Sequence, residues 1–146
     1  MAEENSALIR RWFEEVWNKG NLTVAEEILA PTLRDWDAAR LSYNPADPEI
    51  GQGSEGFKLL VTMFRTAFPD VYLTIEDMIA EGDRVVVRWT ARGTHKGYLK
   101  DIAPTGRQMT VTGVDIHRIV DGKIEETGGN WDTMGMMQQL GVIPQS

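Results

Sequence analysis

The stretch from Thr110 to Trp131, TVTGVDIHRIVDGKIEETGGNW, constrains the fold more than any other part of this chain. Runs rich in β-branched residues stand on both sides of Asp121 and Gly122. An Asp-Gly pair between two such runs is among the strongest short-range signals for a β-hairpin. We therefore predict a long hairpin with its turn at these two residues.

The length of the hairpin loop determines which residues face each other. A two-residue loop would set His117 opposite Glu126, whereas a three-residue loop would set it opposite Glu125. We favour the three-residue loop, because a type I turn followed by a left-handed glycine suits Val-Asp-Gly-Lys better than a primed turn with aspartate first. In that register Asp115 faces Thr127.

The segments before the hairpin first follow a helical period and then alternate. Apolar residues that recur at spacings of three and four predict helices, and alternation predicts strands. Thr23 followed by Glu26 has the spacing of a capping box, and Pro31 would end that helix. A last helix would begin with Asp132 as its N-cap and end at Gly141. The expected helices are 6–18, 23–30, 54–68 and 132–140, and the expected strands are 71–75, 84–95, 107–119 and 123–131.

Helices that precede an antiparallel meander indicate an α+β fold, in which the helices lie on one face of the sheet. A chain of 146 residues, 42% of them hydrophobic, can form one domain with a buried core, so we assign residues 1–146 to a single domain. If the sheet is strongly curved, three N-terminal helices and a short C-terminal helix cannot fill its hollow. The remaining space would be a pocket.

The composition argues against several classes of partner. With a formal net charge of −7 and no basic cluster, the chain lacks the positive surface that nucleic acids and anionic membranes require. It has no cysteine, so a disulfide framework or a thiol nucleophile is not possible. The N-terminus lacks the pattern of a signal peptide, and no run approaches the roughly 20 apolar residues of a membrane span. We expect a soluble, cytoplasmic protein.

We expect neither a metal nor a cofactor. Asp35 and Asp37 could ligate a metal, but no histidine lies near them and their spacing matches no metal motif. Nothing in the chain resembles a phosphate loop, a dinucleotide fingerprint or a nucleophile elbow. The same two acids flank Trp36 in a polar loop that also carries Tyr43, and a loop of this length is more often functional than accidental. We place both aromatic residues in the ligand site, with Trp36 at its mouth.

Asp115 and His117 are the strongest candidates for catalysis. They lie two residues apart on a predicted strand, so their side chains project from the same face and can converge on one bound molecule. If that face is the inner one, Asp115 can serve as an acid or a base. Alternatively, His117 pairs with Glu125 across the hairpin on a solvated or interface surface. The period of two leaves open which face the two residues share.

Aromatic residues and a second histidine complete the candidate site. Trp89 and Trp131 would line a pocket for an aromatic ligand, and the Thr127 hydroxyl could hydrogen-bond to it. On the strand of Trp89, either Trp89 and His95 look inward or Arg88 does. His95 stands near the end of that strand beside two glycines, where a lone histidine is usually a rim or capping residue.

Five segments together resemble the SnoaL-like polyketide cyclase (ester cyclase) family: FEEVWNKGN, EGFKLLVTMFRTAFPD, EGDRVVVRWTARGTHKG, PTGRQMTVTGVDIHRIVDGKIEE and WDTMGMMQQLG. The likeness runs from about residue 5 to residue 141. It implies the nuclear-transport-factor-two-like fold, a cone made of a curved antiparallel sheet closed by helices. It also implies ring closure in polyketide biosynthesis by an intramolecular aldol condensation, without metal or cofactor.

The resemblance also shows a departure at the site. In the best-understood members of the family, a histidine and an aspartate two residues apart on the last strand serve the site, and the aspartate is the acid/base catalyst. These positions align with Thr127 and Gly129, and Trp36 aligns with a further family histidine. Asp115 matches the region of another pocket-facing residue on the neighbouring strand. We therefore predict that Asp115 takes over proton transfer.

Taken together, these patterns predict a cofactor-free enzyme that binds a hydrophobic or aromatic carbonyl compound. Asp115 would be the base, His117 and Thr127 would hydrogen-bond the substrate oxygens, and Trp36, Tyr43, Trp89 and Trp131 would hold its rings. One alternative is a proton-transfer isomerase or an epoxide hydrolase on the same frame. Another is a non-catalytic binding module, which the missing His-x-Asp pair favours. We further expect a homodimer through the outer face of the sheet.

Overall fold

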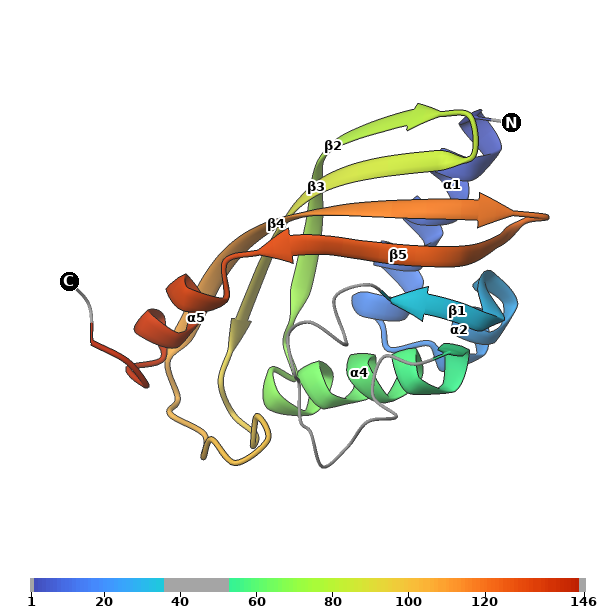
Figure 1. Cartoon of the computed structure of the whole chain (residues 1–146). Coiled ribbons are helices and arrows are strands. Elements are labelled where there is room, and N and C mark those ends of the chain that lie inside the picture. The colour runs from blue at the N-terminus through green and yellow to red at the C-terminus, as the bar shows by residue number, and fades with distance from the viewer. Residues whose placement is uncertain (1, 36–52, 145–146) are drawn as a thin grey trace.

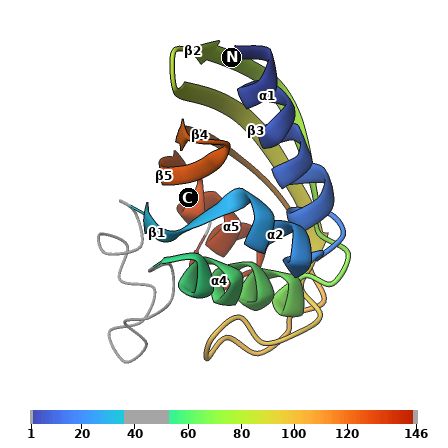
Figure 2. The same ribbon diagram turned by 90° about the vertical axis from the view of Figure 1, so that its right-hand side faces the viewer.

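In the computed structural model, which describes residues 2–35 and 53–144, a five-stranded sheet curves around the helices (Figure 1). A view turned by 90° shows α1, α2 and α4 gathered on the concave side of the sheet (Figure 2). The order of elements is helices first and an antiparallel meander afterwards. The predicted α+β class is confirmed.

The first predicted helix consists of two elements. Helix α1 spans Ala2–Arg11 and runs directly into the π-helix η1, Trp12–Trp17. At the end of η1, the backbone N–H of Asn18 donates to the carbonyl of Phe13 at 3.0 Å, so the bond spans five residues instead of four. The apolar pattern that predicts one helix over residues 6–18 does not reveal this wider turn.

Helix α2, Leu22–Ile28, begins two residues earlier than the predicted capping box implies. Its N-cap is Asn21, whose side chain accepts a hydrogen bond from the Val24 N–H at 3.3 Å. The predicted cap at Thr23 is therefore wrong, because asparagine is at least as good an N-cap as threonine and comes first in the chain.

Strand β1, Leu29–Asp35, follows α2 without a loop and is absent from the prediction. Pro31 interrupts its alternation, yet proline is tolerated where a strand lies at a sheet edge, as β1 does. The strand pairs with β5 in parallel and places Asp35 opposite Thr127. The sheet is thus mixed, and the prediction of an entirely antiparallel sheet is wrong at this edge.

The remaining elements follow the predicted order, and the sheet order is β1-β5-β4-β3-β2. Asp132 caps the last helix as predicted, since its side chain accepts a hydrogen bond from the Gly135 N–H at 2.8 Å. Strand β2 runs through a bulge and is longer than expected. The elements are α4 (Gly53–Ala67), β2 (Tyr72–Glu81), β3 (Arg84–Thr94), β4 (Gln108–Val120), β5 (Lys123–Trp131) and α5 (Thr133–Gln139).

The turn between β4 and β5 contains two residues, so the predicted three-residue loop is wrong. Asp121 and Gly122 have φ values of 51° and 73°. Two positive φ values in succession are typical of a type I′ turn, whose twist matches that of the flanking strands, and aspartate is one of the side chains that tolerate it. Beside the turn, Ile119 faces Ile124.

A bulge next to the turn then shifts the pairing by one residue. Beyond it, His117 faces Thr127 and Asp115 faces Gly129, a register that neither of the two predicted loops gives. The shift arises because one extra residue enters β5 between the pairs Ile119–Ile124 and Arg118–Glu126. Such a residue reverses the alternation of the strand, so Thr127 turns towards the inner face.

The inner face of the sheet forms the core of the protein. Val85, Val87 and Trp89 are at most 8% exposed, whereas Arg88 is exposed on the outer face. Of the two predicted orientations of β3, the one with Trp89 inward is therefore correct. The outer face carries hydrophobic side chains that are open to solvent, among them Val114 at 41% exposure.

Candidate functional site

A cavity lies between the inner face of the sheet and the helices η1 and α4. Most side chains around it are apolar or aromatic, which suits a hydrophobic ligand. They come from both helices, from strands β2 to β5 and from α5, and include Trp17, Phe57, Phe64, Trp89, Trp131 and Met136.

A connected set of aromatic rings forms one side of this cavity. The wide turn of η1 allows Trp12 and Trp17, five residues apart, both to line it. Their ring centroids lie 6.4 Å apart at an interplanar angle of 81°. Phe64 packs against Trp17 at 6.2 Å and edge-to-face against Trp131 at 5.8 Å. These rings present flat apolar surfaces from η1, α4 and β5.

The opposite wall is polar and spans three adjacent strands. Asp115 on β4, Thr127 and Gly129 on β5, and Asp35 on β1 all line the cavity, and we call these four residues the polar strip. Asp35 is 9% exposed and the Asp115 side chain 26%. Among the lining residues that the structure describes there is no lysine, arginine or histidine. Asp35 and Asp115 are thus the two acidic side chains on the described wall of the cavity.

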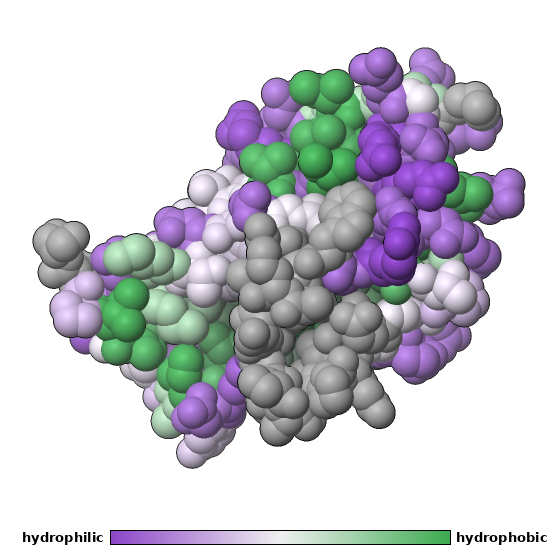
Figure 3. All heavy atoms as spheres, in the orientation of Figure 1, coloured by the Kyte–Doolittle hydropathy of each residue, from purple (hydrophilic) through white to green (hydrophobic). Residues whose placement is uncertain are grey.

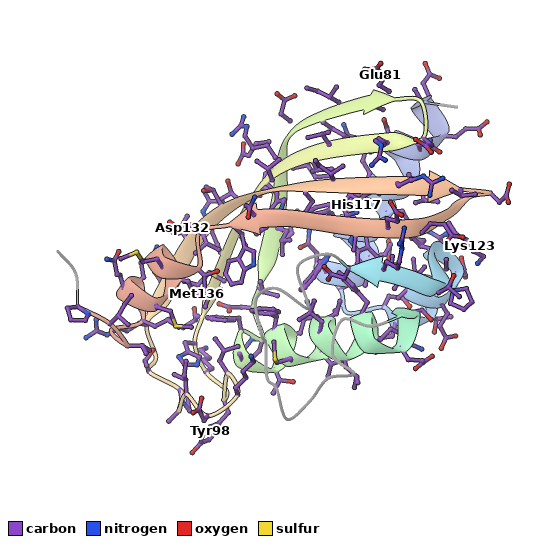
Figure 4. All side chains as sticks on the ribbon, viewed as in Figure 1. Glu81, Tyr98, His117, Lys123, Asp132 and Met136 are labelled. Carbon is purple, nitrogen blue, oxygen red and sulfur yellow. The ribbon has the colours of Figure 1, made fainter. Side chains whose placement is uncertain are left out.

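His117 lies behind the polar strip and does not line the cavity. Its Nδ1 is 2.9 Å from Oγ1 of Thr127, and its Nε2 is 3.7 Å from Oδ2 of Asp115. Burial lowers the pKa of His117 to about 4, because the charged ring would lose its hydration. His117 is therefore neutral at pH 7 and its contact with Asp115 is no ion pair. Figure 4 shows His117 on β4, near the turn and far from Asp132 and Met136.

The hydrogen bond between His117 and Thr127 defines how the ring can act on Asp115. If the Thr127 hydroxyl donates to Nδ1, the ring proton sits on Nε2 and faces the carboxylate. Nε2 has no hydrogen-bond partner within the described structure. A small movement of Asp115 towards the ring would close the 3.7 Å gap to hydrogen-bond distance.

Gly129 makes room for the Asp115 side chain. A Cβ atom at position 129 would lie 2.6 Å from Oδ1 of Asp115 and 2.2 Å from the carbonyl oxygen of Val114. Both distances are far below van der Waals contact, so an alanine here would force the two strands or the carboxylate to move. The glycine and the orientation of Asp115 therefore depend on each other.

The two predicted tryptophans on the sheet both line the cavity. Trp89 lies over Gly113, where a Cβ atom would come within 2.4 Å of its ring. Trp89 is 8% exposed, and its Nε1 is buried without a hydrogen-bond partner in the parts of the chain that the structure covers. The ring of Trp89 thus borders the cavity, while its indole N–H is buried and has no acceptor among the described residues.

His95 lies outside the cavity lining and contacts Thr105 in the loop after β3. Its Nδ1 accepts a hydrogen bond from the Thr105 N–H at 3.2 Å and lies 3.1 Å from the Thr105 hydroxyl. The ring packs on Phe68, which does line the cavity, with centroids 5.4 Å apart. Burial lowers the pKa of His95 as well. The structure thus places this histidine one layer behind the ligand space.

The other predicted features fall partly outside the described residues. Trp36 and Tyr43 lie in the segment 36–52, for which no structure is described. Within residues 2–35 and 53–144, no three His, Asp or Glu side chains gather as metal ligands would. No helix in these same ranges has the length and apolar character to cross a membrane.

Sequence reasoning missed Asp35 as a cavity residue, and it missed the contribution of α4. Asp35 follows Leu33 at the spacing of a strand, a signal that the proline at position 31 obscures. The apolar stripe of α4 supplies Phe57 and Phe64, which the helical period identifies as buried without telling whether they fill the core or border a cavity. Curvature of the sheet decides this, and the sequence pattern does not encode it.

Comparison with known proteins places these features in a family. The family model of the SnoaL-like polyketide cyclases matches residues 7–140. Aklanonic acid methyl ester cyclase DauD of Streptomyces sp. (strain C5) is 33% identical over 136 residues, which cover 92% of this chain and 80% of DauD. Nogalonic acid methyl ester cyclase of Streptomyces nogalater is 36% identical over 101 residues, or 67% of this chain and 75% of that protein. The structure of TsrD from Streptomyces laurentii has a TM-score of 0.83 at 26% identity and covers 98% of both chains.

Proposed function

The chain belongs to the SnoaL-like polyketide cyclase family, and we propose that it closes a ring in a neutral polyketide ester by an intramolecular aldol reaction. One observation carries the proposal: the Asp115 carboxylate stands in the wall of a largely apolar cavity. Two relatives are named as methyl ester cyclases of aklanonic and nogalonic acid, which supports an aromatic polyketide methyl ester as the substrate class. The proposed reaction uses no cofactor.

In this proposal Asp115 is the base. Its carboxylate removes a proton from a carbon next to a carbonyl group, and the electron pair of the broken C–H bond forms an enolate. The enolate carbon attacks a ketone carbon in the same molecule, which forms the new C–C bond and leaves the ketone oxygen as an alkoxide that takes up a proton. The cavity further accelerates the reaction, because it holds the enolate carbon and the ketone carbon of the substrate close to each other.

The electrostatics of the cavity favour an ester over a free acid. Asp35 and Asp115 both face the ligand space, and no positive side chain stands on its described wall. A substrate carboxylate would leave water for a largely apolar cavity and lie near the charged base Asp115, which is costly. A methyl ester removes that charge. We expect the enzyme to convert the methyl ester and to reject the corresponding acid.

The other site residues have supporting roles. Trp89 and Trp131, together with Trp36 and Tyr43 from outside the described residues, hold the substrate rings. Because His117 does not reach the cavity, we assign it a positioning role: its ring orients the carboxylate of the base from behind, and Thr127 fixes the ring. His95 takes no direct part, since Phe68 stands between it and the ligand.

The test is conversion of aklanonic acid methyl ester and nogalonic acid methyl ester by the purified protein, followed by chromatography. Asp115→Asn keeps the shape of the side chain and removes the base, so we expect the rate to fall about 10²- to 10⁴-fold. Asp101→Asn, an isosteric change at an exposed position, is the matched control and should leave the rate unchanged. Retention of full activity by a folded Asp115→Asn protein would rule out this assignment.

A non-catalytic binding module is the main alternative, and the aromatic lining of the cavity favours it. If the protein is a binding module, the esters should quench the fluorescence of Trp17, Trp89 and Trp131 when they bind. The protein should then release the esters unchanged. Asp115→Asn would then bind as tightly as the wild type, and neither protein would form a cyclised product. The two carboxylates in the wall count against this alternative, because a purely hydrophobic ligand gives no reason to bury them.

We also propose that the protein forms a homodimer through the outer face of its sheet. Ile79, Val86 and Ile116 face each other in register across β2, β3 and β4, and Ile79 is 61% exposed and Ile116 38%. Hydrophobic atoms gather over these strands in Figure 3. An apolar row of this kind on a solvated face is typical of an interface. Sedimentation should give a dimer, and Ile116→Lys should give a folded monomer.

A further inference from the structure

Asp35 is a second carboxylate in the cavity, and the reaction described above leaves it without a role. It is the last residue of β1, it is 9% exposed, and its side chain belongs to the cavity lining. The preceding residue, Arg34, pairs with Glu126, which is outside that lining. The positive charge next to Asp35 in the sequence is thus turned away from the ligand space.

The sheet register places the two carboxylates on either side of β5. Asp115 lies opposite Gly129 on one edge of β5, and Asp35 lies opposite Thr127 on the other edge. Two strand spacings across and two residues along give a separation of about 12 Å between the Cα atoms. Both side chains point into the concave space between the two strands, so the distance between their carboxyl groups is shorter than the distance between their Cα atoms. A molecule seated over Gly129 therefore meets Asp115 at one end and Asp35 at the other.

The same cavity carries an independent sign that it binds a polar ligand. The Nε1 atom of Trp89 is buried without an acceptor in the described part of the chain, although the ring lines the cavity. A buried N–H donor without a partner is costly in a folded protein. A ligand with a carbonyl oxygen can offer the missing acceptor after a small shift of the ring.

We propose that Asp35 is the general acid of the aldol step, an inference that rests on the function proposed above. When the enolate carbon attacks the ketone carbon, the C=O π electrons move onto the oxygen. The Asp35 carboxylic acid gives its proton to that oxygen and becomes a carboxylate, while Asp115 holds the proton taken from carbon. One C–C bond and one O–H bond form, and one C–H bond and one C=O π bond break. Proton exchange with water then returns both carboxyl groups to their starting states.

Deuterium exchange separates the two roles, because removing the α proton needs only the base. The probes are aklanonic acid methyl ester and an analogue in which an alcohol replaces the acceptor ketone, so that the analogue can exchange but cannot cyclise. In deuterated buffer, the wild type should cyclise the ester and exchange the α proton of the analogue faster than buffer alone. Asp115→Asn should lose both reactions. Asp35→Asn should keep the exchange within about 3-fold and lose cyclisation about 100-fold or more.

The pH dependence of the rate gives a second readout that a structural role would not change. Cyclisation by the wild type should fall at low pH, where the base is protonated, and at high pH, where the acid is ionised. Asp35→Asn should lose the high-pH decrease and keep the low-pH one. Asp35→Glu retains an acid one methylene longer and should recover part of the cyclisation, which also covers the case in which Asp35→Asn does not fold.

Each other outcome identifies what has failed. Full cyclisation by Asp35→Asn overturns the role of Asp35 and leaves that of Asp115 intact. Loss of exchange together with cyclisation in a folded, ester-binding Asp35 variant also overturns it, because Asp35 would then act before the C–C bond forms. If the wild type neither exchanges nor cyclises, the proposed function fails and the role of Asp35 fails with it.

Discussion

The neutral, buried state of His117 makes the stability of the protein depend on pH in a way that can be calculated. Burial lowers the pKa of this ring from 6.5 to about 4 in the folded protein. In the unfolded chain the ring is hydrated and its pKa returns to about 6.5. Between these two values the unfolded chain takes up a proton that the folded protein does not, so falling pH stabilises the unfolded state.

The size of the effect follows from the two pKa values. Each pKa unit corresponds to about 1.4 kcal/mol, so the folded state should lose about 3 kcal/mol once the pH is below both values. Above pH 6.5 the contribution is fully present, and by pH 4.5 a loss of about 2.5 kcal/mol is expected.

Urea unfolding followed by tryptophan fluorescence at pH 7.0 to 4.5 measures this loss directly. The control is His117→Asn, which retains a polar group near the position of Nδ1 and cannot titrate. His95 and the carboxylates titrate in both proteins, so the difference between their slopes isolates His117. The reasoning would be refuted if both proteins lost the same free energy of unfolding over this range, or if the wild type lost less than about 1 kcal/mol more than the variant.

Three further predictions concern the site and its frame. Gly129→Ala should lower the free energy of unfolding by about 1–3 kcal/mol, because its methyl group would collide with Val114 and Asp115; an unchanged urea midpoint would contradict this. Asp132→Ala removes the N-cap of α5 and should cost about 1 kcal/mol in the same assay, with Asp132→Asn close to the wild type. The double variant Asp115→Ala/Gly129→Asp, which moves the carboxylate to the neighbouring strand, should convert the methyl esters no faster than Asp115→Ala does, because the Val114 carbonyl oxygen would still lie 2.2 Å from the added Cβ atom.

Local sequence signals were sufficient to predict the helices and strands whose hydrophobic residues recur with a clear period. The stripe of α4, the strands β3 to β5 and the Asp132 cap all follow from spacing and residue type within a short window. The features that escaped prediction depend on partners distant in the chain. Strand β1 exists because β5 offers an edge to pair with, which compensates for the proline within it.

The hairpin shows how a correct element can still carry a wrong register. The position of the turn was predictable from Asp-Gly, but the bulge in β5 has no comparable sequence signature. The error altered the site: it changed the partner of Asp115 from Thr127 to Gly129 and the partner of His117 from Glu125 to Thr127. Alternation alone already implied that Asp115 and His117 share a face. They differ in burial, since the Asp115 side chain is 26% exposed and the His117 side chain 1%.

Gly129 is best understood together with Asp115, which faces it across the hairpin. Residues that face each other in an antiparallel pair have Cα atoms about 5 Å apart, so a carboxylate on either strand reaches the same part of the cavity. Position 129 has no room for a side chain, because a Cβ atom there would lie 2.2 Å from the Val114 carbonyl oxygen and 2.6 Å from Oδ1 of Asp115. Gly128 and Gly129 have no side chains, so the cavity wall between Asp115 and Asp35 consists of backbone at these two positions. In the proposed reaction, the absence of a side chain at position 129 lets the base on β4 and the acid on β1 act on one molecule.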